Sequence, residues 1–120
     1  MSGGGASRFP SSMRVKRRKD FDRIYREGST WKGRCFSLHV LACVDGKRMG
    51  IVISRKWGNA VKRNRMKRLL REAFRLNAHR LPNAAIIVRP TTACRDETVE
   101  SLARRLVAAV NETVGREVSE

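Results

Sequence analysis

The sequence predicts an α+β fold, a two-layer α/β sandwich built on a mixed sheet. Residues 35–44 alternate between apolar and polar side chains, as a half-buried strand does. Residues 58–75 carry an apolar stripe at helical spacing, and residues 84–88 form a short, continuous apolar run typical of a buried strand. The order strand, helix, strand requires a crossover connection, which predicts a parallel pair of strands within the sheet.

The chain of 120 residues is long enough for one domain with a modest core. Residues 1–13 are rich in Gly and Ser and lack periodicity, so we expect a disordered lead-in. The domain itself is expected over residues 14–114, followed by a short tail at residues 115–120.

In the first half of the domain, a short helix is expected at residues 20–27, with Asp20 as its N-cap and Gly28 as a left-handed C-terminal residue. A short strand around Trp31 and the strand at residues 35–44 should follow. The dipeptide Asp45-Gly46 is a strong hairpin signal, so residues 49–54 are expected to return antiparallel to that strand.

The helix at residues 58–75 should begin at Asn59, because an Asn side chain readily accepts a hydrogen bond from the first helical turn. Projection at 100° per residue gives an apolar face of Met66, Leu69, Leu70, Ala73, Phe74 and Leu76. The opposite arc is basic and consists of Arg63, Asn64, Lys67, Arg68, Arg71 and Arg75. Arg65 projects elsewhere, near Glu72, and could pair with it. A last amphipathic helix, from about Arg95 onward, should cover the sheet.

The formal net charge is +16, and the excess is concentrated in two regions. Residues 14–19 hold five basic residues in six, and residues 55–75 hold nine basic residues against one acid, Glu72. A solvated basic face is common on helices, but such faces normally alternate in sign. Cations also occupy the first helical turns, where the helix dipole disfavours each by roughly 0.3–1 kcal/mol. The arrangement therefore favours a polyanionic partner, most simply a nucleic acid.

The remaining composition argues against other classes of protein. No apolar run approaches the length of a membrane-spanning helix and the start is not signal-like, so we expect a cytoplasmic protein. Three cysteines, Cys35, Cys43 and Cys94, have no CxxC spacing and are expected to be reduced. His39 and His79 have no metal-ligand spacing, so no metal site and no catalytic residues are expected on the protein itself.

Several of these residues form a pattern that resembles the protein subunit of bacterial ribonuclease P, which removes the 5′ leader from precursor tRNA. The resemblance covers roughly residues 14–110. It includes Asp20-Phe21 with Tyr25 and Gly28, the segment Gly50-Ile51-Val52, and above all Gly58-Asn59-Ala60-Val61 followed by Arg63-Asn64-Arg65, Lys67-Arg68 and Arg71. The chain departs from the family pattern at His39, where Tyr is usual, at Arg55, where Lys is frequent, and at Asn83, where Asp is common.

The resemblance implies a four-stranded sheet, three helices and an unusual left-handed crossover through the basic helix. It also implies a catalytic RNA subunit and Mg²⁺ bound mainly by that RNA, with the protein assisting hydrolysis. The residues expected to face the RNA subunit are Arg63, Asn64, Arg65, Lys67, Arg68 and Arg71. Those expected to hold the precursor tRNA leader are Phe21, Tyr25, His39 and Lys56. Further phosphate contacts are expected from Arg14, Lys16, Arg17, Arg18, Arg55, Lys62 and Arg75.

Two alternatives belong to other functional classes. A protein-only, metal-dependent nuclease would need converging carboxylates or histidines, which the sequence does not show. A stand-alone RNA- or DNA-binding module of the ribosomal-protein type could use Asn64 and its neighbouring arginines to read base edges in a groove. Preference for precursor over mature tRNA would separate the subunit from such a module.

Overall fold

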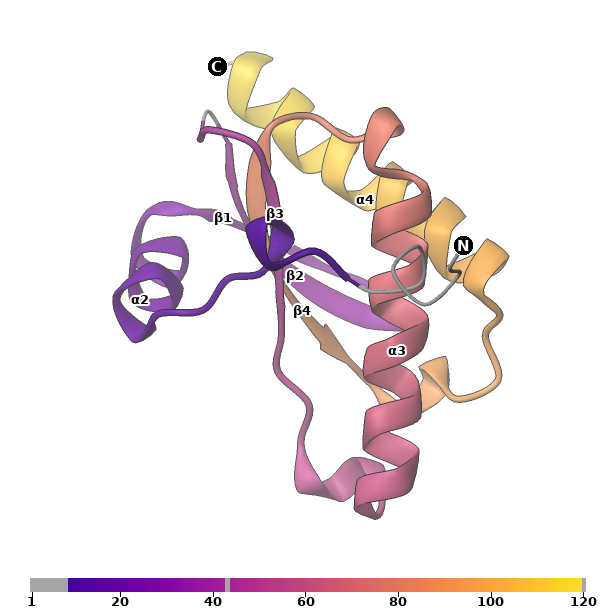
Figure 1. Ribbon diagram of the computed structural model, residues 1–120. Coiled ribbons are helices and arrows are strands. Elements are labelled where there is room, and N and C mark those ends of the chain that lie inside the picture. The colour runs from indigo at the N-terminus through magenta and orange to yellow at the C-terminus, as the bar shows by residue number, and fades with distance from the viewer. Residues whose placement is uncertain (1–8, 43, 120) are drawn as a thin grey trace, which may run out of the picture.

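A computed structural model describes residues 9–42 and 44–119 of the chain. Its centre is a four-stranded mixed sheet in the order β1-β2-β4-β3 (Figure 1). The strands are β1 (Ser29–Lys32), β2 (Phe36–Ala42), β3 (Lys47–Ile51) and β4 (Ala84–Pro90). β2 is antiparallel to both β1 and β4, whereas β3 is parallel to β4. The predicted α+β class and the mixed sheet are therefore confirmed.

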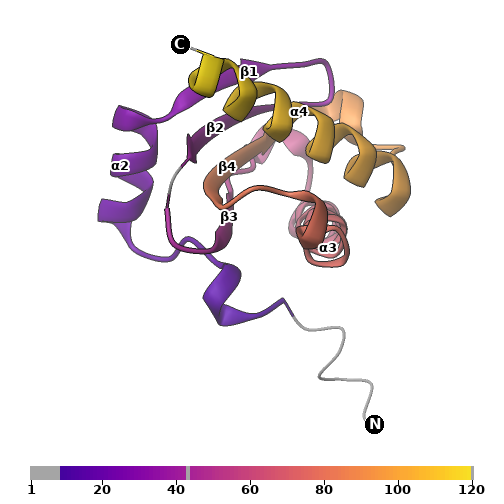
Figure 2. The same ribbon diagram turned by 90° about the horizontal axis from the view of Figure 1, so that it is seen from above.

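Three α-helices cover the sheet: α2 (Arg18–Glu27), α3 (Ala60–Leu76) and α4 (Val99–Ser119). Seen from above, α3 and α4 lie on one face of the sheet and α2 on the other (Figure 2). The larger core lies under α3 and α4, and a smaller one joins Ile24 of α2 to Ala85 and Ile87 of β4. No helix among the described residues is long and apolar enough to span a membrane.

The prediction that residues 49–54 pair antiparallel with the preceding strand is wrong, although the expected turn at Gly46 is present. Gly46 adopts φ 83°, the left-handed conformation that a tight turn requires. The strand that follows nevertheless pairs with β4, with Met49 opposite Ile86, and not with β2. α3 forms the crossover between these parallel strands. The left-handed sense of this crossover stays a prediction from the resemblance.

The chain's first described residues are folded, in contrast to the expected lead-in. Phe9 is 7% exposed and packs edge-on against Phe74 of α3, with ring centroids 5.8 Å apart. A 3₁₀ turn, η1 (Ser11–Met13), follows, and Arg14 forms a β-bridge with Met49. The folded part therefore begins at least as early as Phe9; residues 1–8 lie outside the described range. At the other end, α4 continues through the expected tail to Ser119.

The ends of α2 and α4 differ from the expectation. α2 begins at Arg18 after Arg17 without a side-chain cap, so Asp20 lies in its first turn and is not the N-cap. Gly28 has φ −81° and is therefore not left-handed. Its role is steric, because a Cβ there would lie 2.6 Å from the Ile24 carbonyl oxygen and 2.8 Å from that of Val40.

α4 begins at Val99, later than expected. Thr98 precedes it, and its Oγ1 accepts a hydrogen bond from the Ser101 backbone N–H at 3.1 Å, as in an N-terminal cap. Cys35 and Cys94 are buried free thiols, and burial raises the pKa of Cys94 to about 12. Cys43 lies outside the described residues.

Candidate nucleic-acid interface

The start of α3 is fixed by the predicted cap. The Asn59 side-chain Oδ1 accepts a hydrogen bond from the Lys62 backbone N–H at 3.0 Å. Gly58 before it has φ 139°, which favours glycine. This start sets the rotation of the helix, and Met66, Leu70, Ala73 and Phe74 point into the core. Leu69 is half-buried as part of the same face, whereas Leu76 is 50% exposed and was wrongly placed in the apolar stripe.

A groove of about 400 Å³ runs between α3 and the N-terminal segment, and we call it the α3 groove. It is lined by Phe9, Arg14, Asn64, Lys67, Arg68, Arg71 and Glu72. The Arg14 guanidinium lies 5.8 Å from the centroid of the Phe9 ring, so the aromatic anchor also positions a cation at the groove. The structure thus brings together four of the six residues expected to face an RNA subunit, together with Arg14.

Positive charge in the α3 groove is only weakly compensated. Both burial and the nearby charge of Arg14 lower the pKa of Arg71. The one acid in the lining, Glu72, receives hydrogen bonds from Arg75 to both carboxylate oxygens at 3.1 Å. Its charge is therefore already shared with a cation outside the groove lining. Converging like charges of this kind are stabilised when a polyanion binds among them.

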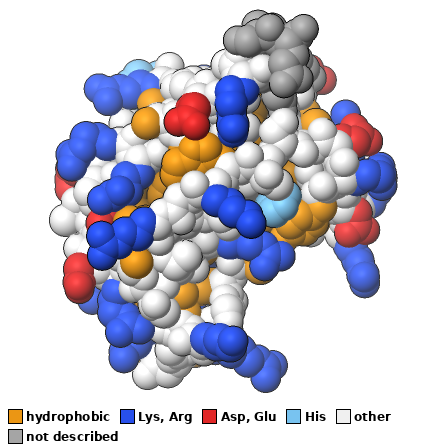
Figure 3. Space-filling model, turned by 180° about the vertical axis from the view of Figure 1, so that it is seen from behind, with side chains coloured by type: hydrophobic (Ala, Val, Ile, Leu, Met, Phe, Trp, Pro, Cys, Tyr) orange, Lys and Arg blue, Asp and Glu red, His pale blue; other side chains and the backbone are white. Residues whose placement is uncertain are grey.

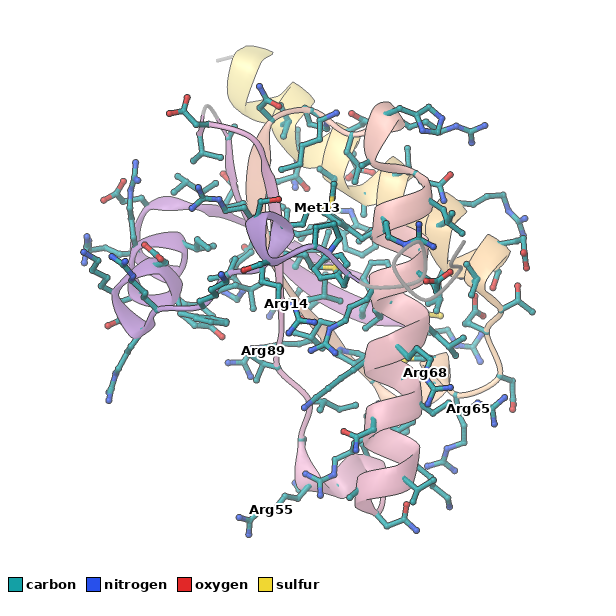
Figure 4. All side chains as sticks on the ribbon, viewed as in Figure 1. Met13, Arg14, Arg55, Arg65, Arg68 and Arg89 are labelled. Atoms are coloured by element: carbon teal, nitrogen blue, oxygen red, sulfur yellow. The ribbon has the colours of Figure 1, made fainter. Side chains whose placement is uncertain are left out.

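The pairing considered for Arg65 and Glu72 is wrong, because Glu72 pairs with Arg75. Arg65 instead lines a hollow of about 460 Å³ on another side of α3, together with Trp57, Lys62, Met66, Leu69 and residues 95–98. Arg63 is half-buried, and its Nε has no hydrogen-bond partner among the described residues. The basic signature is thus divided between two sides of the helix. In Figure 4, Arg65 and Arg68 are neighbours that extend from α3 on the side away from α2, although they line different hollows.

Aromatic side chains gather on the opposite face of the sheet, beside α2. The rings of Tyr25 and His39 meet edge to face, with centroids 4.7 Å apart and an interplanar angle of 78°. Phe21 lies over Gly50, where an added Cβ would come within 2.7 Å of the ring. Arg89 of β4 donates a hydrogen bond from Nη2 to the Tyr25 hydroxyl at 2.9 Å. We call Phe21, Tyr25, His39 and Arg89 the α2 face.

His39 is neutral over a wider pH range than an ordinary histidine. Burial, and secondly the charge of Arg89, lower its pKa from the usual value of 6.5. Its Nδ1 is buried and has no hydrogen-bond partner among the described residues. The side of the molecule opposite to the view of Figure 1 carries exposed hydrophobic side chains with Lys and Arg side chains around them (Figure 3). The α2 face therefore combines aromatic surface with nearby cations.

The other expected phosphate contacts lie around these two surfaces. Lys16 and Arg17 line a hollow of about 460 Å³ with Arg14, Ser11, Ser12, Lys19, Asp20 and Arg48. Arg18 begins α2, and Arg55 and the expected leader contact Lys56 are exposed in the turn η2 (Arg55–Trp57). Figure 1 places η2 beside the start of α3, away from α2. Lys56 therefore belongs to another part of the surface than Tyr25 and His39.

Sequence analysis did not identify three of the residues at these surfaces: Phe9, Arg48 and Arg89. Phe9 stands in a Gly/Ser-rich segment that gives no periodicity. Arg89 precedes a proline and was interpreted only as the end of a strand. Its spacing of two residues from Ile87, a buried position on the α2 side, could have placed it on the same face. The described residues contain no group of three or more His, Cys, Asp or Glu side chains that could hold a metal ion.

Comparisons with known proteins agree with this geometry. A family model described as Ribonuclease P matches residues 9–114. The chain is 36% identical over 113 residues to the "Ribonuclease P protein component" of Chlamydia abortus, covering 88% of this chain and 79% of that protein. The protein of the same name from Desulforapulum autotrophicum is 34% identical over 108 residues, covering 89% and 82%.

Solved structures give the same result. The RNase P protein from Thermotoga maritima superposes with a TM-score of 0.73 at 30% identity, covering 82% of this chain and 96% of that chain. The Staphylococcus aureus RNase P protein at 2.0 Å gives a TM-score of 0.71 at 33% identity, covering 82% and 93%. The family match begins at Phe9, the buried residue that packs against Phe74 of α3.

Proposed function

This chain belongs to the ribonuclease P protein family, and from that premise we propose that its α3 groove and its α2 face bind two different RNAs. The family places it as a subunit in tRNA 5′ processing and as part of an endonuclease complex. The α3 groove binds the catalytic RNA subunit, and the α2 face binds the single-stranded 5′ leader of precursor tRNA. Hydrolysis itself is carried out by the RNA.

The α3 groove is suited to a structured RNA because its contacts are charged and carry no evident base-reading element apart from Asn64. Arg14, Lys67, Arg68 and Arg71 converge there, and Arg14 and Arg71 repel one another in the free protein. Phosphate oxygens would accept their N–H groups and relieve that repulsion. This convergence is the observation that carries the proposal.

The α2 face is suited to an unpaired strand because it offers rings as well as charge. Stacking of a base on an aromatic side chain contributes about 1–3 kcal/mol and does not depend strongly on sequence. Phe21 and Tyr25 are half-buried, so each keeps part of its ring exposed while packing holds it in place. Bases in a duplex would not reach these rings, since their faces are already stacked.

In the proposed complex, magnesium is bound mainly by the RNA. The protein's contribution is to hold two RNAs together and to lower their mutual repulsion. This effect should be largest where Mg²⁺ is scarce, because cations on the protein and cations in solution screen the same phosphates.

The test is reconstitution with a bacterial ribonuclease P RNA and a precursor tRNA at low Mg²⁺. We expect the protein to accelerate leader removal, and Arg68→Ala to reduce that acceleration. Arg104→Gln is a matched control, because Arg104 is an exposed cation on α4 and lies outside both surfaces. Salt-dependent RNA binding without any acceleration of cleavage would refute the proposal and leave a stand-alone binding module.

A further inference from the structure

Arg89 stands at the open end of a row of side chains on β4. Ala85 and Ile87 precede it at spacings of two and are buried with Ile24 under α2. Arg89 continues the same row but is exposed, opposite Ser37 in the β2–β4 register. Figure 4 shows its side chain extending from the sheet on the side of α2. It therefore lies where the covered part of this face meets solvent.

The contacts of Arg89 are directed at one aromatic ring. Its Nη2 donates to the Tyr25 hydroxyl at 2.9 Å, and its Cζ lies 5.5 Å from the centroid of the same ring. His39 meets that ring from another direction at 4.7 Å. Tyr25 is thus held by a hydrogen bond, a cation–π contact and an aromatic contact, which reduces the freedom that its side chain would lose on binding a base.

The Arg89 guanidinium is not neutralised by this arrangement. The tyrosine hydroxyl is uncharged, and no ion pair to Arg89 occurs among the described residues. A guanidinium carries five N–H donors in a planar fork, and the described hydrogen bonds use one. An exposed cation with unused donors beside a fixed ring has the two elements that a nucleotide needs, a stacking surface and a phosphate ligand.

We propose that Arg89 is a positioning residue of the leader site, which holds the Tyr25 ring for stacking and donates its remaining N–H groups to a phosphate of the leader strand. This inference rests on the proposed function of the α2 face and adds a residue that the family resemblance did not assign. Lysine could supply the charge but not the fork, so it could not hold the tyrosine and the phosphate at the same time.

The experiment measures the affinity of the reconstituted complex for precursor tRNA and for mature tRNA, and takes the ratio as the contribution of the leader. Arg89→Gln should reduce this ratio by about 10-fold or more, because it removes a charged hydrogen bond and loosens the stacking ring. Arg89→Lys should lie between Arg89→Gln and the unaltered protein. Arg104→Gln should leave the ratio unchanged.

Two further readouts separate positioning from folding. Tyr25→Phe keeps the ring and removes only the hydroxyl that Arg89 binds, so its effect should be non-additive with Arg89→Gln. Arg89→Gln should also decrease the salt slope of leader-dependent binding by about 0.7, whereas Tyr25→Phe should not. Thermal unfolding should be unaffected in both variants.

An unchanged ratio in Arg89→Gln, or full additivity, would overturn the role of Arg89 while leaving the leader site intact. If the unaltered complex shows no preference for the leader, the proposed function of the α2 face fails as well.

Discussion

Replacement of Arg71 by Gln should weaken RNA binding without lowering folding stability. Burial and the charge of Arg14 both lower the pKa of Arg71, so the free protein holds this cation in an unfavourable place. Gln removes the charge and keeps part of the side chain. The free energy of unfolding should therefore stay within about 0.5 kcal/mol or rise, as for other substitutions that remove no packed core group. A residue whose role was structural would instead cause a loss.

The effect on binding follows from the four cations that line the α3 groove. Each phosphate contact contributes about 0.7–0.9 to the slope of log affinity against log salt. Arg71→Gln should thus lower the slope for the RNA subunit by that amount, which corresponds to about threefold between 50 and 200 mM salt. Filter binding across a salt series and urea unfolding measure the two quantities, with Arg104→Gln as control. An unchanged slope, or a marked loss of stability, would refute the reasoning.

Three other perturbations test separate parts of the structure. Phe9→Ala should cost about 3 kcal/mol in urea unfolding, because Phe9 packs in the core against α3; a cost below about 0.5 kcal/mol would mean that the segment is not docked in solution. Gly50→Ala should displace Phe21, since the new Cβ would lie 2.7 Å from its ring, and leader preference should fall while binding of the RNA subunit persists; the opposite pattern would contradict the α2 assignment. The native pKa of His39 lies below its usual 6.5, so the unfolded chain takes up a proton first, and stability should decline as the pH falls below about 6.5 until the native pKa has been passed. His39→Phe should remove that part of the decline, and an identical pH profile in the variant would exclude His39 as its source.

The sequence was sufficient where the controlling interactions are local. Asn59 caps α3 through a residue three positions away. The periodicity from that cap predicted the buried positions Met66, Leu70, Ala73 and Phe74, but it failed at the end of the helix, where Leu76 is exposed. Projection also separated Arg65 from Lys67 and Arg71, which line a different hollow. Projection did not identify the partner of Glu72. Its carboxylate pairs with Arg75, three residues further along the helix, and not with Arg65.

Local sequence patterns could not predict contacts between residues that are far apart in the chain. The turn at Gly46 formed as expected, but a turn does not determine which strand lies next to the one that leaves it. The apolar strand β4 takes an inner position, between β2 and β3, because both of its faces are covered and a buried strand must be paired on both edges. Phe9 was missed for a similar reason, since its only signal is contact with Phe74, 65 positions further along the chain.

The most direct test of the central claim is crosslinking from one position on each surface of the assembled complex. A photoreactive phenylalanine analogue in place of exposed Asn64 lies in the α3 groove, and one in place of Ser37 lies beside Arg89 on the α2 face. With the RNA subunit and precursor tRNA both present, we predict crosslinks from position 64 to the RNA subunit and from position 37 to the 5′ leader. Leader crosslinks from position 64, or RNA-subunit crosslinks alone from position 37, would contradict the division of the two RNAs between these surfaces.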